Sequence, residues 1–442
     1  MNVPAMQPVH PIARRAVWSW ITYDLANTIF SMGILSLYFP LWVRDSVGAA
    51  RADTVYGNFS SASYLLIFIV SPLLGAMTDR ARRRMPFLVV STLLCIGCTM
   101  LLGRVGFWPT MLAFMLANFG YQAGLQFYDA MLPEVSTEEN RGRISGIGVG
   151  IGYFGSFIAI ALGFLTRDRL LLFVLIGLTF LACALPCFLF VKERGNPGPR
   201  TVFSLQMIRE STAQTIATLR HGREYPGLLR FLLARVFYTD AINTVIAFMG
   251  LYVVNVAIAS GVDAGSGERA ARFVMLSAIV FAVAGGFAWG QLVDRIGPRR
   301  TLDLVLWLWV ATFLMAAAIG LLSLPIAFLY VVAALAGIAL GGTWSADRPL
   351  MLRLTPPDRI GEFYGLYGMV GRFSAIAGPF IWANVAGVAT GRFGMAPARA
   401  QGLNILVLLL FIVVARLIVR PVTDARRDWV ALRRAGSQPA AS

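Results

Sequence analysis

Charged residues are scarce in this chain. Asp, Glu, Lys and Arg together make up 14% of the 442 residues, whereas hydrophobic residues make up 57%. Apolar runs recur along the whole length, each close to the ~20 residues that cross the hydrocarbon core of a bilayer. The composition therefore predicts an integral membrane protein built from α-helices, and it leaves no segment for a soluble catalytic domain.

Histidine and cysteine are also rare. The two histidines, His10 and His221, lie outside the apolar runs, so a buried histidine relay is excluded and any proton relay has to use carboxylates. The four cysteines form two close pairs without a histidine beside them, and we interpret them as packing residues. No metal, no cofactor and no buried nucleophile–base pair are expected, so the chain is not predicted to be an enzyme.

Twelve apolar segments have the length of a membrane helix. No short apolar segment with a small-residue cleavage site precedes them, so no removable signal peptide is expected. The predicted spans are 17–43, 54–77, 86–105, 107–132, 143–165, 170–191, 228–258, 271–293, 301–322, 325–347, 361–388 and 402–420.

The net charge of +16 is distributed unevenly. Most of the 38 Lys and Arg lie on the side shared by the N-terminus, the loops that follow even-numbered spans, and the C-terminus. This asymmetry predicts that both termini are cytoplasmic, in a cell (inner) membrane. The positive charge also suggests nucleic-acid binding, but no nucleic-acid motif accompanies it. Membrane lipids are the partners expected for the basic tail, and the protein is expected to be a monomer.

Two polar patterns occur twice with the same period. Asp24 and Asn27 in the first span are matched by Asp240 and Asn243 in the seventh, about 216 residues later. A carboxylate among apolar residues is costly, so its repetition at matching places marks a functional site. The chain therefore consists of two copies of a membrane half. The predicted parts are a six-helix bundle at 1–195, a cytoplasmic linker with an amphipathic helix at 196–226, a second six-helix bundle at 227–422 and a disordered basic tail at 423–442.

The second repeated pattern is Gly-x-x-x-Asp-Arg at the end of a span. The glycine allows close approach of two helices, and the carboxylate can meet the positive N-terminus of a helix from the other bundle. We expect Asp79 to meet span 11 and Asp294 to meet span 5, holding the bundles closed on that side. The expected gating residues are Gly75, Asp79, Arg80, Gly290, Asp294 and Arg295.

Polar side chains on three spans are predicted to line a cavity. Span 4 carries a stripe that stays on one side of the helix, and buried amides need partners that a solute or water can supply. The alternative is that these groups bond neighbouring helices. Expected solute-binding residues are Asn27, Asn118, Gln122, Gln126, Asn243 and Arg372, and expected coupling residues are Asp24, Asp240 and Asp129.

Buried charges of both signs are expected in the spans. Asp347 and Arg348 end span 10, and Arg372 lies well inside span 11. With the other candidates the carboxylates outnumber the arginines by one, so most charges can pair. An unmatched carboxylate is the group expected to bind a proton or a cation.

The two Gly-x-x-x-Asp-Arg loops resemble the signature of the major facilitator superfamily, although the first lacks the glycine that Gly297 supplies in the second. Residues 23–40, 127–155, 231–248 and 354–380 are similar to its vacuole-effluxer-like branch, which includes an amino-acid effluxer of the yeast vacuole. That branch usually has Asn at the position of Asp129 and Lys at that of Arg372. The resemblance implies two pseudo-symmetric six-helix bundles and covers essentially the full chain.

The expected function is secondary active transport of a small polar solute by alternating access. The resemblance implies an amino acid or related compound, with efflux as a direction. The buried carboxylates of Asp24 and Asp240 predict a proton or sodium gradient as the driving force. Three alternatives stay open: a sugar–cation symporter of the melibiose-carrier type, a lipid or lysolipid flippase, and a receptor that transports nothing.

Overall fold

The computed structural model describes residues 12–81, 83–166, 168–193, 209–210, 213, 225 and 227–425. Nearly all of the predicted linker, the tail beyond residue 425 and the side chain of Arg80 lie outside the described residues. Every regular element within the described residues is a helix.

The first half of the chain forms one bundle. Its first span is continuous from Arg14 to Val47, and its middle part is π-helical. The short α6 follows the fourth span. The elements are α1 (Arg14–Phe30), η1 (Ser31–Tyr38), α2 (Phe39–Val47), α3 (Ala49–Ala81), α4 (Met85–Leu101), α5 (Phe107–Ala130), α6 (Leu132–Val135), α7 (Arg141–Leu165) and α8 (Arg169–Phe190).

The second half forms the other bundle, with one helix for each predicted span. The elements are α10 (Leu228–Ala259), α11 (Ala264–Ile296), α12 (Pro298–Leu322), α13 (Phe328–Leu354), α14 (Ile360–Gly391) and α15 (Pro397–Val419). The predicted count of twelve spans is therefore confirmed. The end of span 10 is wrong, because α13 continues to Leu354 and places Asp347 and Arg348 inside the helix.

Nine helices of the described part of the chain are long and apolar enough to cross a membrane. The three remaining spans fall outside this group for different reasons. The helix α4 has only 17 residues, and α5 carries polar side chains such as Gln126. In α14, which carries the buried Arg372, several side chains lie outside the described residues. A membrane helix tolerates such residues where they face a bundle interior, so α5 and α14 are candidates for lining a site.

Each bundle has its own apolar core. The first is centred on buried rings, among which Trp20 stacks on Tyr128 with ring centroids 4.4 Å apart. The second includes Trp309 and Phe313, whose rings meet edge to face. Large apolar side chains such as Phe164 and Phe380 are exposed on the outside, as expected of a surface that faces lipid.

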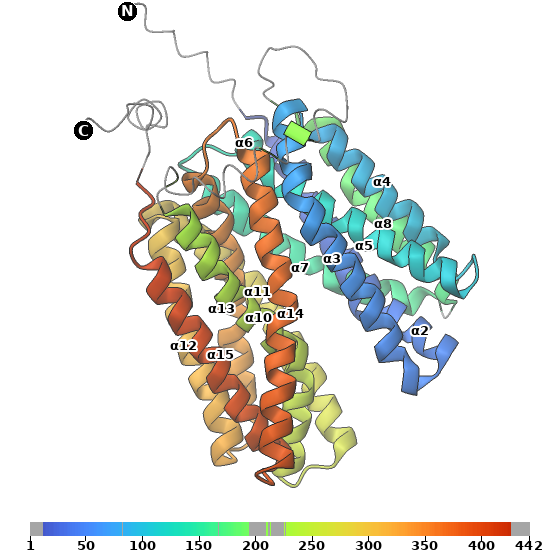
Figure 1. The fold of residues 1–442 in the computed structure, drawn as a ribbon, viewed down its shortest axis with the longest axis vertical. Helices are drawn as coiled ribbons and strands as arrows, with labels where there is room; N and C mark the ends of the chain where they lie inside the picture. The colour runs from blue at the N-terminus through green and yellow to red at the C-terminus, as the bar shows by residue number, and fades with distance from the viewer. Residues whose placement is uncertain are drawn as a thin grey trace, which may run out of the picture.

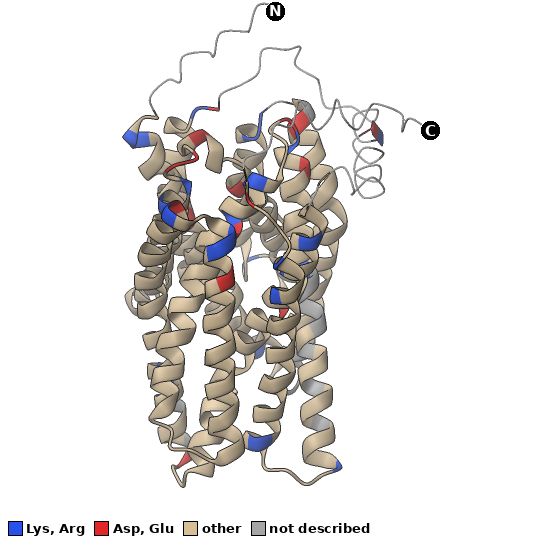
Figure 2. Cartoon of the chain, turned by 90° about the vertical axis from the view of Figure 1, so that its left-hand side faces the viewer, with Lys and Arg blue, Asp and Glu red and all other residues tan. Residues whose placement is uncertain are grey.

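The two bundles meet mainly along α3 with α14 and α7 with α11. Figure 1 shows that the bundles approach each other at the end where α6 lies and α15 finishes, which we call the terminal end, and diverge toward the opposite end. Most charged residues lie in the half of the molecule nearest the terminal end (Figure 2). This distribution agrees with the asymmetry of Lys and Arg in the sequence.

Candidate functional site

The terminal end is closed by two carboxylates that cap helices of the opposite bundle. Asp79 at the end of α3 accepts hydrogen bonds from the backbone N–H groups of Gly361 and Glu362, both at 2.7 Å, in the first turn of α14. Asp294 at the end of α11 accepts from Gly142 and Arg143 in α7, at 2.7 and 2.9 Å. The two expected contacts with spans 11 and 5 are therefore present. A carboxylate at a helix N-terminus satisfies free N–H groups and favours the helix dipole.

Other expected gating residues contribute differently. Gly75 lets α3 approach α14 so closely that a Cβ atom added there would lie 2.1 Å from the carbonyl oxygen of Gly361. Gly290 lies against Gly142 and Gly146 of α7. Arg295, by contrast, is exposed at the end of α11. The helices at this end of the molecule are therefore joined by close backbone packing at Gly75 and Gly290, and the exposed Arg295 does not take part in that packing.

A cavity of about 650 Å³ lies between the bundles. Its lining runs from Asp129 and Arg348, near the terminal end, to Ser36 and Ile246, which lie past the middle of their spans toward the opposite end. The contacts of Asp79 and Asp294 therefore lie between the cavity and the terminal end of the molecule. Six aromatic side chains contribute to its wall, namely Tyr64, Tyr121, Tyr153, Trp344, Tyr364 and Tyr367.

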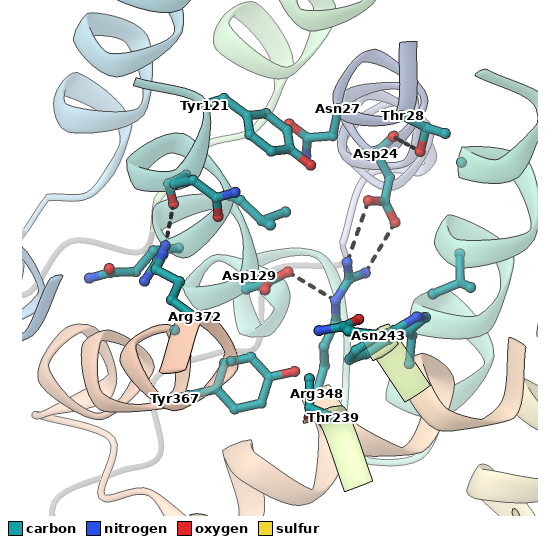
Figure 3. Close-up of a pocket in the computed structure, with 18 of the residues that line it drawn as sticks. Asp24, Asn27, Thr28, Tyr121, Asp129, Thr239, Asn243, Arg348, Tyr367 and Arg372 are labelled. Atoms are coloured by element: carbon teal, nitrogen blue, oxygen red, sulfur yellow. Dashed lines mark hydrogen bonds and ion pairs between the residues drawn. The ribbon is translucent and has the colours of Figure 1, made fainter. Parts of the chain in front are cut away.

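Arg348 of α13 joins the two bundles through two carboxylates. Its Nη1 and Nη2 atoms donate to Asp24 of α1 at 3.1 and 3.4 Å, and its Nε atom lies 2.9 Å from Asp129 of α5. Figure 3 shows the guanidinium group between the two aspartates. All three residues are at least 92% buried, so the charges are compensated mainly by one another. The sequence predicted two coupling aspartates here, but not that one arginine would serve both.

A second ion pair lies within the C-terminal bundle. The Nε atom of Arg235 donates to Asp347 at 3.0 Å, and its guanidinium stacks 3.6 Å from the ring centroid of Tyr367. Tyr238 and Tyr367 donate to the same carboxylate at 2.5 and 2.8 Å. Asp347 is therefore fully engaged, and it balances Arg235 rather than another charge in the cavity.

Arg372 of α14 has neutral partners. Its Nη1 atom donates to the hydroxyl of Ser71 at 2.9 Å and its Nη2 atom donates to the backbone carbonyl of Gln122 at 2.8 Å. Its Nε atom is buried without a hydrogen-bond partner among the described residues. Gly368 makes room for this side chain, since a Cβ atom there would lie 2.6 Å from Nη1. Arg372 is thus a buried cation at the cavity wall with unused hydrogen-bonding capacity.

Two neutral side chains of the wall also have unused polar atoms. Both amide atoms of Asn27 and the hydroxyl of Thr239 are buried without a partner among the described residues. Gln122 and Asn243 line the cavity as predicted. Gln126 lines it too, but its amide already exchanges hydrogen bonds with Ser71 of α3.

Two predicted residues do not line the cavity. Asn118 is fully buried about two turns of α5 before Gln126, and Asp240 faces α14, where it accepts the backbone N–H of Gly378 at 2.8 Å. The rotation of α10 explains the second case. Arg235, Thr239 and Asn243 follow one another every four residues and form its cavity-facing stripe, so Asp240 is turned by about 100° away from Thr239.

Arg348 and the aromatic wall are the main features that the sequence analysis did not assign to the site. Arg348 was recognised as a buried charge, but its partners lie 324 and 219 residues away in the chain. The aromatic residues carried no separate signal, because tyrosine is common in both membrane cores and interfaces.

Comparison with known proteins supports the fold. A family model described as Major Facilitator Superfamily matches residues 25–379 and 241–441. The chain is 24% identical over 387 residues to the uncharacterized MFS-type transporter YxiO of Bacillus subtilis, covering 82% of this chain and 86% of that protein. It is 28% identical to an uncharacterized protein of Aquifex aeolicus, with 81% and 86% covered.

A fungal relative is similar over part of its length. Autophagy-related protein 22-1 of Aspergillus fumigatus is 26% identical over 323 residues, which is 66% of this chain and 50% of that protein. Solved structures with the same fold include the human organic anion transporter MFSD10, with a TM-score of 0.69, 15% identity and coverage of 91% and 100%. A bacterial homologue of the iron transporter ferroportin in an outward-facing state has a TM-score of 0.67, 14% identity and coverage of 95% and 100%.

Proposed function

The chain belongs to the major facilitator superfamily, and from this we propose that it is a secondary active transporter that carries a small polar solute across the membrane by alternating access. The observation that carries the proposal is the cavity of about 650 Å³, which both bundles line and which Asp79 and Asp294 close at one end. Rocking of the bundles about this cavity exposes it to each side in turn.

The solute contacts are assigned to the polar wall. Asn27, Asn243, Thr239 and Gln122 supply hydrogen-bonding groups, and Arg372 supplies a positive charge. The resemblance to the vacuole-effluxer-like branch supports a solute of amino-acid size and efflux as the direction. The cell membrane, with both termini in the cytoplasm, is the proposed location.

Ion coupling is assigned to Asp24 and Asp129. Both carboxylates contact the single guanidinium of Arg348, so one of them can take up a proton while the other keeps its ion pair. Separation of the bundles at the terminal end requires Arg348 to leave Asp24 and Asp129, because these residues belong to different bundles. Protonation weakens that attraction and links the ion to the conformational change.

A sugar is the second candidate solute. The six aromatic rings and the amides of Asn27 and Asn243 supply the apolar surfaces and hydrogen-bonding groups that a sugar ring uses. This candidate does not require Arg372, whereas an acidic solute does.

Counterflow in proteoliposomes tests the proposed transport. Purified protein is reconstituted, the liposomes are preloaded with amino acids, short peptides, sugars or lysolipids, and exchange of the same labelled solute is measured against protein-free liposomes. Transport of a water-soluble solute is expected. Exchange of lysolipid alone would indicate a flippase. If no solute exchanges and a cysteine placed at Asn27 reacts with thiol reagents from one side only, the transporter proposal is wrong.

A further inference from the structure

The buried charges around the cavity are balanced in number but not in pairing. Three guanidinium groups face three carboxylates, so the cluster as a whole is neutral when all are ionised. Arg235 pairs with Asp347, whereas Arg348 serves two carboxylates and Arg372 serves none. The members of this charge cluster are Arg235, Arg348, Arg372, Asp24, Asp129 and Asp347.

This pairing decides which charged solute group can bind. Within the described part of the chain Arg372 has only neutral partners and an unused Nε atom, so an anionic oxygen can join it without breaking an ion pair. A solute ammonium finds no free carboxylate among the described residues of the wall, since Asp24 and Asp129 are both held by Arg348 and Asp240 faces Gly378 instead of the cavity. The unused groups of Asn27 and Thr239 are neutral and suit hydroxyl, carbonyl or amide groups.

Adding an anion disturbs the balance of the cluster. The loaded site would carry one excess negative charge, and an uncompensated charge away from water is costly. A proton on Asp24 or Asp129 removes that excess, and the other carboxylate keeps its contact with Arg348. The other titratable groups around these two carboxylates are Arg235 and Asp347, already paired, Arg372, and five tyrosines that are neutral near pH 7, namely Tyr121, Tyr128, Tyr153, Tyr364 and Tyr367.

We propose that the solute is an organic monoanion bound through its carboxylate or similar group by Arg372, and that it crosses the membrane together with one proton carried by the Asp24 and Asp129 pair. The inference rests on the proposed transport function. The solute stays ionised, the proton binds a carboxylate oxygen of Asp24 or Asp129 on one side and leaves it on the other, and no net charge moves. An ammonium group on the solute is not required.

The solute class is tested with compounds that share one carbon skeleton. A 2-hydroxy acid keeps only the carboxylate, an amino acid has both charges, and an amino-acid amide keeps only the ammonium. Binding is measured as a change in the melting temperature of the purified protein, with alanine, leucine and phenylalanine skeletons. The 2-hydroxy acid of at least one skeleton is expected to bind at least as tightly as the matching amino acid, and the amide is not expected to bind. Binding of the amide, or no carboxylate-dependent binding with any skeleton, overturns the proposal.

The stoichiometry is tested in proteoliposomes with the acid that binds best. Uptake is expected to follow an imposed pH gradient and to be unaffected by a membrane potential set with potassium and valinomycin. In Asp129→Asn the empty cluster has one excess positive charge and the loaded cluster is neutral without a proton. This variant is therefore expected to lose its response to the pH gradient and to gain a response to the potential. Asp24→Asn is the second variant if Asp129→Asn is not stable.

The outcomes separate this inference from the transport function. Potential-dependent uptake by the parent protein contradicts paired movement of anion and proton. Exchange of a cationic or neutral solute in counterflow, with no competition by 2-hydroxy acids, would show that the solute is not an organic anion, while the transport function would stand. Absence of exchange with every solute contradicts the transport function itself.

Discussion

Arg348 and Arg372 are both buried guanidinium groups at the cavity wall, but their partners differ. Arg348 is held by two carboxylates, and removing one member of a buried ion pair typically costs ~3 to 5 kcal/mol because a charge is left uncompensated. Arg372 contacts a hydroxyl and a carbonyl oxygen and keeps an unused donor. At the scale of single residues, the partners of a charge therefore separate an arginine held in ion pairs from one available to a solute.

Arg372→Gln is expected to weaken solute binding by ~1 to 3 kcal/mol, the cost of losing a buried charge-assisted hydrogen bond. This corresponds to roughly 5- to 150-fold in the dissociation constant. Equilibrium binding of the solute found in counterflow gives the measurement. Arg392→Gln, at an exposed position after the same helix, is the control and should bind like the parent. Equal binding by the Arg372 variant would show that this residue does not contact the solute.

Asp240→Asn should behave differently from substitutions of Asp24 and Asp129. Asp240 contacts the backbone of Gly378 and does not line the cavity, so the substitution weakens the contact between α10 and α14. We expect a lower melting temperature, from a loss of ~1 kcal/mol, while transport still responds to the ion gradient. Loss of that response in a protein that melts like the parent would restore Asp240 as a coupling residue.

At the scale of helices, the terminal end depends on where two helices begin. The first turns of α14 and α7 offer backbone N–H groups that have no partner within their own helix, and Asp79 and Asp294 supply the acceptors from the opposite bundle. The same contacts that cap these helices therefore also join the bundles. Breaking them is expected to change the balance between states more than the fold of either bundle.

Asp79→Asn keeps an acceptor oxygen but loses the charge that favours the helix N-terminus, an effect of ~0.3 to 2 kcal/mol. We expect the terminal end to open more often. Reaction of Thr239→Cys with a thiol reagent applied from that side measures the opening. Asp168→Asn is the matched control. The carboxylate of Asp168 accepts the backbone N–H of Leu170 and caps α8, so this cap joins residues of the same bundle. A rate that does not exceed that of the control contradicts the gating role.

Gly75→Ala tests the close approach of α3 and α14. The added Cβ atom would lie 2.1 Å from the carbonyl oxygen of Gly361, so the terminal end cannot close as it does here. The variant should favour the state open at the terminal end and transport more slowly. Gly57→Ala lies on the same helix, where the new Cβ atom would have no described atom within 4 Å apart from the adjoining residues and turns of its own helix, and its transport should match the parent. Similar rates for both variants would show that the contact is dispensable.

At the scale of the whole molecule, two similar bundles contribute unlike charges to one cavity. The first bundle supplies Asp24 and Asp129, and the second supplies three arginines. The internal repeat therefore preserves the helices and the closing contacts, whereas the chemistry of the wall is asymmetric. Polar contacts between the halves then include the ion pairs of Arg348 with Asp24 and Asp129 and the helix caps made by Asp79 and Asp294 at the terminal end.

The orientation of the molecule can be measured directly. The positive-inside rule predicts that the terminal end faces the cytoplasm. An impermeant thiol reagent applied to intact cells should label Ser260→Cys, exposed after α10 at the opposite end, and should leave Arg300→Cys, exposed at the terminal end, unlabelled. The parent protein shows the background from its four native cysteines. Labelling of Arg300→Cys without labelling of Ser260→Cys would show that the orientation is the reverse of the proposed one.

The sequence by itself determined the helices, the repeat and the closing contacts. Long apolar runs predict spans because the backbone must satisfy its own hydrogen bonds in lipid. The glycine and aspartate of the repeated loops predict a close approach and a helix cap, and Asp79 and Asp294 make those caps. These features depend on residues close together in the chain or on a pattern that occurs twice.

Only the tertiary structure decided which polar groups face the cavity and which charges pair. Helical spacing places Thr239, Asp240 and Asn243 relative to one another, but the rotation of α10 is set by packing, and this turns Asp240 toward Gly378. Arg348 meets Asp24 across 324 residues because the two bundles dock. That docking leaves Arg372 without a carboxylate partner among the described residues. The physical reason is that the attraction between two charges depends on their distance in space and not on their separation along the chain.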